Sequence, residues 1–244
     1  MFKGSIVALI TPFDRHGNVC HDKIAELIDF HSENGTRGIL LLGTTGENPT
    51  LSLEERKDMV DKAIAHARGK IQIIVGTGSN ATIETIKLTK FAEISGADAA
   101  LVITPYYNKP TQDGLEAHFK AVAAKTKLPI IIYNVPSRTG VNILPETVLK
   151  LSKIDNIVAI KEASGDISQI SDIHRLCGEK FTILSGDDGM TLPIMAVGGK
   201  GVISVTANVA PRKVADLTNA WLEGNHSKAL KLHEELITLH TPCS

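Results

Sequence analysis

The sequence has few of the features that mark secreted, membrane-bound or disulfide-stabilised proteins. None of its apolar runs approaches the roughly 18 residues of a membrane-spanning helix. The apolar run after Met1 is short and has no cleavage site behind it, so we expect no signal peptide. The cysteines, Cys20, Cys177 and Cys243, are odd in number, widely spaced and form no CxxC motif. These absences predict a protein without a membrane partner that works in the reducing cytoplasm.

The sequence is also poor in aromatic residues and nearly neutral. Aromatic residues make up 4% of the chain and the net charge is -1, which is not the basic pattern of a nucleic-acid-binding protein. The histidines are scattered, and those at 226, 233 and 240 would lie about 10 Å apart along a helix, too far for one metal ion. We therefore expect neither a nucleic-acid partner nor a metal site.

Short apolar runs alternate with amphipathic segments along the chain. The strand-like runs are 4–10, 38–42, 71–75, 99–104, 129–133, 157–161, 181–185 and 201–205. Helical segments between them include 52–67, opened by a capping box, and 80–95. This alternation predicts an α/β protein, a (β/α)8 TIM barrel over 1–224 with a shortened C-terminal helical extension over 225–244. A doubly wound open sheet is the alternative, but no Gly-rich phosphate-binding turn follows the first strand.

The run Ile157-Val158-Ala159-Ile160 ends abruptly in Lys161. A wholly apolar run is typical of a strand buried on both faces, so Lys161 is expected where the strand leaves the sheet. One interpretation is an ordinary solvated lysine, since buried lysines are rare. The other is a desolvated amine with a lowered pKa that forms a Schiff base with a carbonyl substrate. The rest of the chain has to decide between them.

Polar side chains recur where the predicted strands end. They are Thr44 and Thr45, Tyr106 and Tyr107, Tyr133 with Arg138 just beyond it, Lys161 and Gly186. In a barrel the carboxyl ends of all strands meet at one face, so these groups would ring one cavity. Each has a plainer explanation; Asp187 and Asp188, for example, could simply cap a helix. Their shared placement favours a common site.

This set of groups permits a limited chemistry. The strand ends carry no Cys-His or Ser-His-Asp grouping and no pair of carboxylates suited to glycoside hydrolysis. An amine nucleophile with phenol and hydroxyl groups remains, and it could convert a ketone into an imine and then an enamine while a tyrosine moves the protons. Arg138 could hold a substrate carboxylate by a bidentate pair, and Thr44 and Thr45 another. The pattern predicts a class I aldolase or lyase for a 2-keto acid.

Three motifs in order resemble the dihydrodipicolinate synthase family, within the superfamily of pyruvate-dependent class I aldolases that includes N-acetylneuraminate lyase. They are GTTGE at 43–47, YNVPSRTG at 133–140 and IKEASG at 160–165, and the resemblance runs from Met1 to about His240. It implies a lyase that condenses pyruvate with L-aspartate 4-semialdehyde to 4-hydroxy-tetrahydrodipicolinate, in lysine and diaminopimelate biosynthesis. It implies no cofactor beyond the covalent imine, and a homo-oligomer, a dimer of dimers.

The resemblance also assigns roles. Lys161 would be the Schiff-base lysine and Tyr133 the central proton relay, linked through Thr44 to Tyr107 of a neighbouring subunit. Thr45 would bind the pyruvate carboxylate and Arg138 that of aspartate semialdehyde. The backbone of Gly186 and Ile203 would line the pyruvate site. Sialic-acid lyases usually lack the Arg-Thr-Gly that begins at Arg138, which favours the synthase.

Two features depart from the family pattern. Members are usually longer, with further helices after the barrel that cover it and support the tetramer, and here only the first of them is expected. Asn80, Glu84 and Tyr106 match a regulatory lysine site, but Leu53 and Arg56 stand where lysine-sensitive members often carry histidines. An arginine is always charged and opposes a cationic ligand. We therefore expect weak or absent inhibition by lysine.

Two other functions stay open from the sequence. One is a retro-aldol lyase for a sugar acid or another 2-keto acid, which would use the same imine chemistry. The other is a non-catalytic barrel that binds a small keto acid or a partner. A binding module has no need of an amine nucleophile, so Lys161 together with the phenols, hydroxyls and guanidinium speaks against it.

Overall fold

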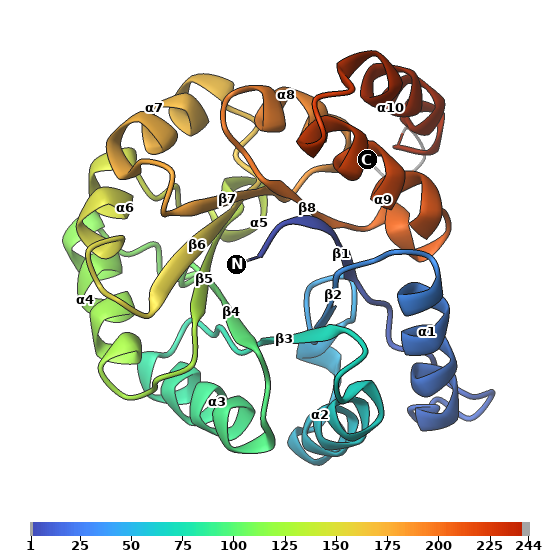
Figure 1. The fold of residues 1–244 in the computed structure, drawn as a ribbon. Coiled ribbons are helices and arrows are strands. Elements are labelled where there is room, and N and C mark those ends of the chain that lie inside the picture. The colour runs from blue at the N-terminus through green and yellow to red at the C-terminus, as the bar shows by residue number, and fades with distance from the viewer. Residues whose placement is uncertain (1, 241–244) are drawn as a thin grey trace.

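The computed structural model describes residues 2–240, and within them the strands close into a parallel barrel in the order β1 to β8 (Figure 1). The strands are β1 (Gly4–Ala8), β2 (Gly38–Leu41), β3 (Gln72–Gly76), β4 (Ala99–Ile103), β5 (Ile130–Asn134), β6 (Ile157–Glu162), β7 (Thr182–Ser185) and β8 (Gly201–Ser204). Pairing of β1 with both β2 and β8 closes the barrel, with Ile6 beside Gly38 on one side and Ile203 on the other. The predicted TIM barrel is confirmed, and the open sheet is excluded.

Helices surround the barrel, except for the short α5 (Pro136–Thr139), which lies within the ring of strands in the view of Figure 1. The others are α1 (His21–Glu33), α2 (Leu53–Ala67), α3 (Thr82–Ser95), α4 (Gln112–Ala123), α6 (Pro145–Leu151), α7 (Ile167–Cys177), α8 (Thr191–Ala196), α9 (Pro211–Leu222) and α10 (His226–His240). Short 3-10 turns occupy η1 (Asn48–Thr50), η2 (Asp188–Met190) and η3 (Thr206–Asn208). No helix within residues 2–240 is both long enough and apolar enough to cross a bilayer. Cys243 lies outside the described residues.

The strand residues divide into two apolar cores because successive side chains point to opposite faces of a strand. Ile6, Leu40, Ile74, Ile131 and Leu184 fill the barrel interior. Their sequence neighbours on the strands pack outward against the helices; in β5 these are Ile130 and Ile132. Both faces are therefore buried, which explains why the strands read as continuous apolar runs rather than as an alternation.

The helix signals in the sequence are largely confirmed. The Ser52 side chain accepts from the Glu55 N–H and the Glu55 carboxylate accepts from the Ser52 N–H, so the predicted capping box is formed. Helix α3 begins at Thr82 rather than at Asn80, because residues 77–81 form the connection from β3. Two features were not predicted: β6 continues through Glu162, and α5 carries Arg138 on a single turn that Pro136 begins.

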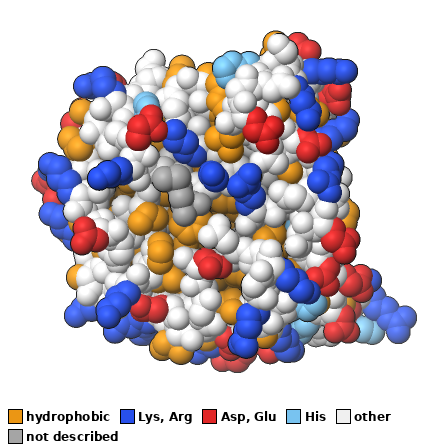
Figure 2. Space-filling view, viewed as in Figure 1, with side chains coloured by type: hydrophobic (Ala, Val, Ile, Leu, Met, Phe, Trp, Pro, Cys, Tyr) orange, Lys and Arg blue, Asp and Glu red, His pale blue; other side chains and the backbone are white. Residues whose placement is uncertain are grey.

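The surface shows no strong segregation of charge on the face seen in Figure 2. Positive and negative side chains are interspersed around its rim, and hydrophobic surface lies nearer the centre. This agrees with the near-zero net charge of the chain. The last helix, α10, packs against α9, and its Leu239 reaches the cavity described below.

Candidate active site

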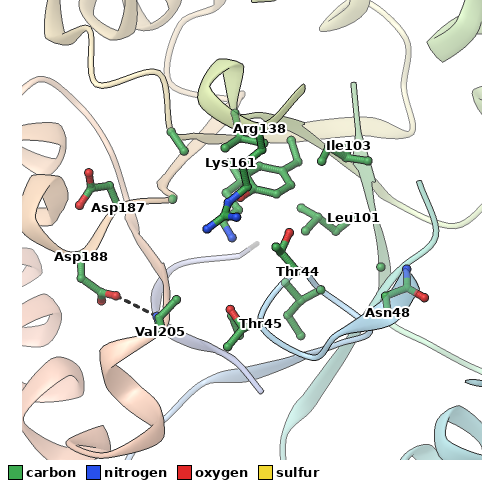
Figure 3. Close-up of a pocket in the computed structure, with 18 of the residues that line it drawn as sticks. Thr44, Thr45, Asn48, Leu101, Ile103, Arg138, Lys161, Asp187, Asp188 and Val205 are labelled. Atoms are coloured by element: carbon green, nitrogen blue, oxygen red, sulfur yellow. Dashed lines mark hydrogen bonds between the residues drawn. The ribbon is translucent and has the colours of Figure 1, made fainter. Parts of the chain in front are cut away.

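A cavity of about 890 Å³ opens at the carboxyl ends of the strands. Its lining brings together most of the side chains that the sequence singled out: Thr44, Thr45, Tyr106, Tyr133, Arg138, Lys161 and Gly186. They come from the ends of β2, β4, β5, β6 and β7 or from the loops and short helix that follow. In Figure 3, Lys161 and Arg138 direct their nitrogen atoms into the same part of the cavity, opposite Thr44 and Thr45. The convergence expected from a barrel is therefore present.

Lys161 is 5% exposed, so it is not a solvated lysine at the end of a strand. Burial lowers the pKa of its amine to about 8, the negative charge of Asp188 acts against this, and the positive charge of Arg138 adds to it. The amine nitrogen lies 4.2 Å from the centroid of the Tyr133 ring. A substantial fraction of such an amine is neutral near pH 8, which is the form that attacks a carbonyl carbon.

Tyr133 is held beside Lys161 by the sheet. The two residues are partners in the parallel register of β5 and β6, and both side chains point into the barrel. Burial raises the pKa of the Tyr133 phenol, while Arg138 and a hydrogen bond with the Thr44 side chain oppose that rise. The phenol therefore stays protonated and connected to Thr44, as a group that passes protons needs to be.

Gly186 gives Lys161 its space. A Cβ atom at position 186 would lie 2.8 Å from the Ala163 Cβ and 3.0 Å from the Lys161 Cε, closer than normal contact. The Gly186 N–H also donates to the Glu162 carbonyl at 2.8 Å. A glycine directly after β7 therefore lets the backbone approach the Cε of Lys161, the carbon that carries the amine. Ile203 lies deeper, in the apolar barrel interior, and is not among the described residues that line the cavity.

Tyr107 takes a different position from the other predicted residues. Its side chain is 87% exposed and its backbone has a φ of +70°, a strained conformation for a bulky residue. Among the described lining residues Tyr106 is present and Tyr107 is not. Within one chain Tyr107 therefore points away from the cavity. Its expected role across a subunit contact stays a prediction.

The residues of the expected regulatory site are divided: Tyr106 lines the cavity, whereas Asn80 and Glu84 are not among its described lining residues. Asn80 is in the β3–α3 connection and Glu84 is in the first turn of α3, where it pairs with Lys87 at 3.6 Å. Leu53 is exposed, and the Arg56 Nε donates to the Leu51 carbonyl at 3.0 Å. The lysine site stays a prediction.

The two aspartates after β7 behave differently from each other. The Asp187 carboxylate accepts from the Gly189 N–H at 2.9 Å, so it caps η2, as the plainer explanation proposed. Both aspartates line the cavity. The Asp188 carboxylate differs in that it holds the loop after β8, accepting from the Val205 N–H at 2.8 Å, as Figure 3 shows, and from the Thr206 N–H at 3.0 Å. Sequence reasoning missed this role; an acid at the end of the seventh strand was the available signal.

The cavity combines a nucleophilic amine, a neighbouring phenol and a guanidinium that can bind an anionic group of a substrate. Within residues 2–240 no group of histidine, cysteine, aspartate or glutamate side chains is arranged to hold a metal ion. The arrangement suits imine formation with a keto acid and proton transfer at the adjacent carbon.

Comparison with known proteins gives a consistent result. The model of the dihydrodipicolinate synthetase family matches residues 1–243. A 4-hydroxy-tetrahydrodipicolinate synthase from Syntrophus aciditrophicus (strain SB) is 53% identical over 239 residues, which are 98% of this chain and 82% of the relative. The crystal structure of dihydrodipicolinate synthase from Aquifex aeolicus has a TM-score of 0.96 and 53% identity, over 98% of this chain and 82% of that one. A solved structure described as the first monomeric dihydrodipicolinate synthase variant has a TM-score of 0.96 at 43% identity, covering 98% of this chain and 81% of that one.

Proposed function

The chain belongs to the dihydrodipicolinate synthetase family, and we propose that it condenses pyruvate with L-aspartate 4-semialdehyde to 4-hydroxy-tetrahydrodipicolinate. This is a step of lysine and diaminopimelate biosynthesis, catalysed by a lyase with class I aldolase chemistry. The observation that carries the proposal is the buried amine of Lys161, with its lowered pKa, above the ring of Tyr133. The covalent imine takes the place of a cofactor.

The first step is imine formation. The neutral Lys161 amine attacks the keto carbon of pyruvate and forms a carbon–nitrogen bond. The former keto oxygen then leaves as water after receiving protons, which are relayed by the Tyr133 phenol beside the amine and by Thr44, its hydrogen-bond partner. The Thr45 side chain lines the other side of the cavity (Figure 3), which supports the proposal that it binds the pyruvate carboxylate. The protonated imine then draws electrons from the methyl carbon, which loses a proton and becomes an enamine.

The second step joins the two substrates. The enamine carbon attacks the aldehyde carbon of aspartate semialdehyde, and the aldehyde oxygen takes up a proton. Arg138 holds the carboxylate of this substrate, because its guanidinium lines the cavity and matches a carboxylate in bidentate geometry. The amino group of the same substrate then attacks the imine carbon and displaces Lys161. This closes the product ring and returns the free amine.

The assembly and location of the enzyme are further parts of this proposal. We infer a homo-oligomer in which Tyr107 completes the proton relay of a neighbouring subunit, supported by its exposed side chain and strained backbone. Because one solved relative is a monomeric variant, the oligomeric state of this protein should be measured, by size-exclusion chromatography with light scattering. The described cysteines, Cys20 and Cys177, are free, which supports a reducing cytoplasmic setting.

Product analysis tests the proposed reaction. The protein is incubated with pyruvate and L-aspartate 4-semialdehyde, and the products are measured by mass spectrometry. A parallel reaction supplies N-acetylneuraminate and measures released pyruvate. We expect 4-hydroxy-tetrahydrodipicolinate in the first reaction and no pyruvate in the second. Pyruvate release from the sugar acid, without condensation in the first reaction, would identify a retro-aldol lyase instead.

A further inference from the structure

A buried carboxyl group lies directly behind the reactive lysine. Glu162 follows Lys161 in β6, and because side chains alternate along a strand its side chain points away from the barrel interior, into the layer between sheet and helices. It is 0% exposed. A buried acid is costly unless its oxygens are hydrogen-bonded, so its presence here calls for an explanation that the reaction steps above do not supply.

The hydrogen bonds of Glu162 come from neutral donors on three different segments. The Asn134 Nδ2 of β5 lies 3.0 Å from one carboxylate oxygen and 3.2 Å from the other. The Ser164 N–H donates at 2.8 Å and the Gln169 Nε2 of α7 at 3.3 Å. Burial raises the pKa of Glu162, and the bonds from Ser164, Asn134 and Gln169 act in the opposite direction. Four donor contacts fit an acceptor-only carboxylate.

Asn134 extends this network toward α6. Its Nδ2 also donates to the Asn142 Oδ1 at 2.8 Å, and its Oδ1 accepts from the Ile143 N–H at 3.2 Å. Asn142 in turn donates to the Gln169 Oε1 at 2.7 Å. The amide–carboxylate pair is therefore fixed from both sides, by the segment before α6 and by α7.

The Asn134–Glu162 pair lies next to the Tyr133–Lys161 pair in the register of β5 and β6. Tyr133 lies beside Lys161, and Asn134 lies beside Glu162, at the end of the same ladder. The ladder is irregular at its start, where Ile130 pairs with Ile157 but Ile131 pairs with Ala159, so Val158 is an extra residue. A slip of one residue beyond this bulge would turn Lys161 out of the barrel and Glu162 into it.

We propose that Asn134 and Glu162 are positioning residues that lock the register of β5 and β6 and so hold the Lys161 amine against the ring of Tyr133. They act through the backbone from the opposite face of the sheet and touch no substrate. This inference rests on the proposed function, because its consequence is measured on the pyruvate imine. It extends the active site beyond the groups that line the cavity.

Exchange of the two side chains tests the pair. N134D places two carboxylates side by side. E162Q puts an amide group where the Glu162 carboxylate accepts its hydrogen bonds. The double variant N134D/E162Q restores an amide–carboxylate pair with the two groups exchanged. We expect each single variant to slow pyruvate imine formation and kcat by about 10- to 100-fold, with a smaller change in the KM for pyruvate, because small displacements of reacting groups cost rates of this size. The double variant should recover most of the loss.

A pH profile separates positioning from simple stability. If the single variants displace Lys161 toward solvent, the midpoint of imine formation moves to higher pH; the double variant should return it. T36V is the matched control, since it breaks another buried pair, the Thr36 hydroxyl and His31 Nδ1 at 3.2 Å, in the segment before β2. It should lower the unfolding temperature without changing the rate or the profile. If the single exchanges do not fold, Q169A provides a milder variant, because it removes one hydrogen-bond donor from Glu162. It should lower the rate of imine formation in the same direction, by a smaller factor.

The outcomes are distinguishable. The proposal would be overturned if the folded variants, including Q169A, are less stable but keep the wild-type rate and pH midpoint of imine formation. The pair would then have a purely structural role. Failure of the double variant to recover, when it folds as well as the single variants, would also contradict it. A wild-type protein that forms no imine with pyruvate would overturn the proposed function itself.

Discussion

The Lys161 amine lies 4.2 Å from the centroid of the Tyr133 ring, and this contact sets the chemistry of the cavity. The face of the ring lies beside the amine, and the Tyr133 hydroxyl is hydrogen-bonded to Thr44. Burial of the amine disfavours the charged ammonium, and two oppositely charged neighbours, Asp188 and Arg138, adjust its pKa in opposite directions. The amine is therefore reactive at a pH where an ordinary lysine is fully protonated.

The pH dependence of imine formation follows from this. The rate with pyruvate should rise with pH and level off above a midpoint near 8, because only the neutral amine attacks. Removal of the Arg138 charge should move the midpoint up, and D188N should move it down. Stopped-flow or quench measurements across pH check both shifts. Movement of both midpoints in the same direction would contradict the electrostatic explanation.

Arg138 should bind the second substrate and not the first, so that its effect on pyruvate is confined to the pH midpoint of imine formation. R138A is expected to keep the pyruvate adduct but to lower kcat/KM for aspartate semialdehyde by about 10- to 100-fold, the size of a lost charge-assisted hydrogen bond. R175A is the matched control, because Arg175 is an exposed arginine of α7 whose partner is Asp172. Steady-state kinetics with each substrate varied in turn provide the measurement. Loss of the adduct in R138A would show that Arg138 serves pyruvate instead.

Two buried histidines should make the protein sensitive to acid. His31 and His118 are neutral in the fold, since burial lowers the pKa of each to about 4 from an ordinary 6.5. The unfolded chain binds protons at these positions first, so stability is complete above about pH 6.5 and falls as the pH drops toward 4. Urea unfolding across this range measures the slope.

Asparagine variants test which groups cause the slope. Both histidines use Nδ1, toward the hydroxyls of Thr36 and Thr82, and an asparagine amide can reach the same position. H31N and H118N should therefore each flatten the pH dependence, whereas H16N, at an exposed histidine, should not. An unchanged slope in both buried variants would assign the acid sensitivity to other groups.

Lysine should inhibit the enzyme weakly or not at all. The Arg56 guanidinium is tethered to the Leu51 carbonyl and is always charged, so it opposes a cationic ligand, and Leu53 offers no polar group. Activity titrations with L-lysine check this, with R56H expected to increase sensitivity and R68H, at an exposed arginine, to leave it unchanged. Half-inhibition of the wild type at submillimolar lysine would contradict the expectation.

The barrel was predictable from the sequence because strands buried on both faces appear as continuous apolar runs, and helices packed on a sheet carry apolar residues on one face. It also predicted that Lys161, Tyr133, Thr44 and Arg138 would meet, since parallel strands end at one face of a barrel. The burial of Lys161 was not decidable from its own strand. It depends on Tyr133 of β5 and on the absence of a side chain at Gly186, directly after β7.

Other parts of the site were out of reach of sequence patterns. Helix α5 is a single turn, too short for periodicity to reveal, so Arg138 was placed only in a loop. The contacts of Glu162 join it to Asn134 on β5 and to Gln169 on α7, and nothing in the apolar pattern of β6 indicated that the strand continued to Glu162. Asp188 looked like a helix cap until the loop after β8 was placed against it.

The most direct test of the central claim is borohydride reduction of the protein with pyruvate, followed by intact and peptide mass measurement. We predict one reduced pyruvate adduct per chain, located on Lys161, and none after K161A, or K161R if the alanine variant does not fold. Protein reduced without pyruvate is the control. Folded wild-type protein that forms no adduct, or an adduct on a different lysine, would contradict the assignment of Lys161 as the Schiff-base residue.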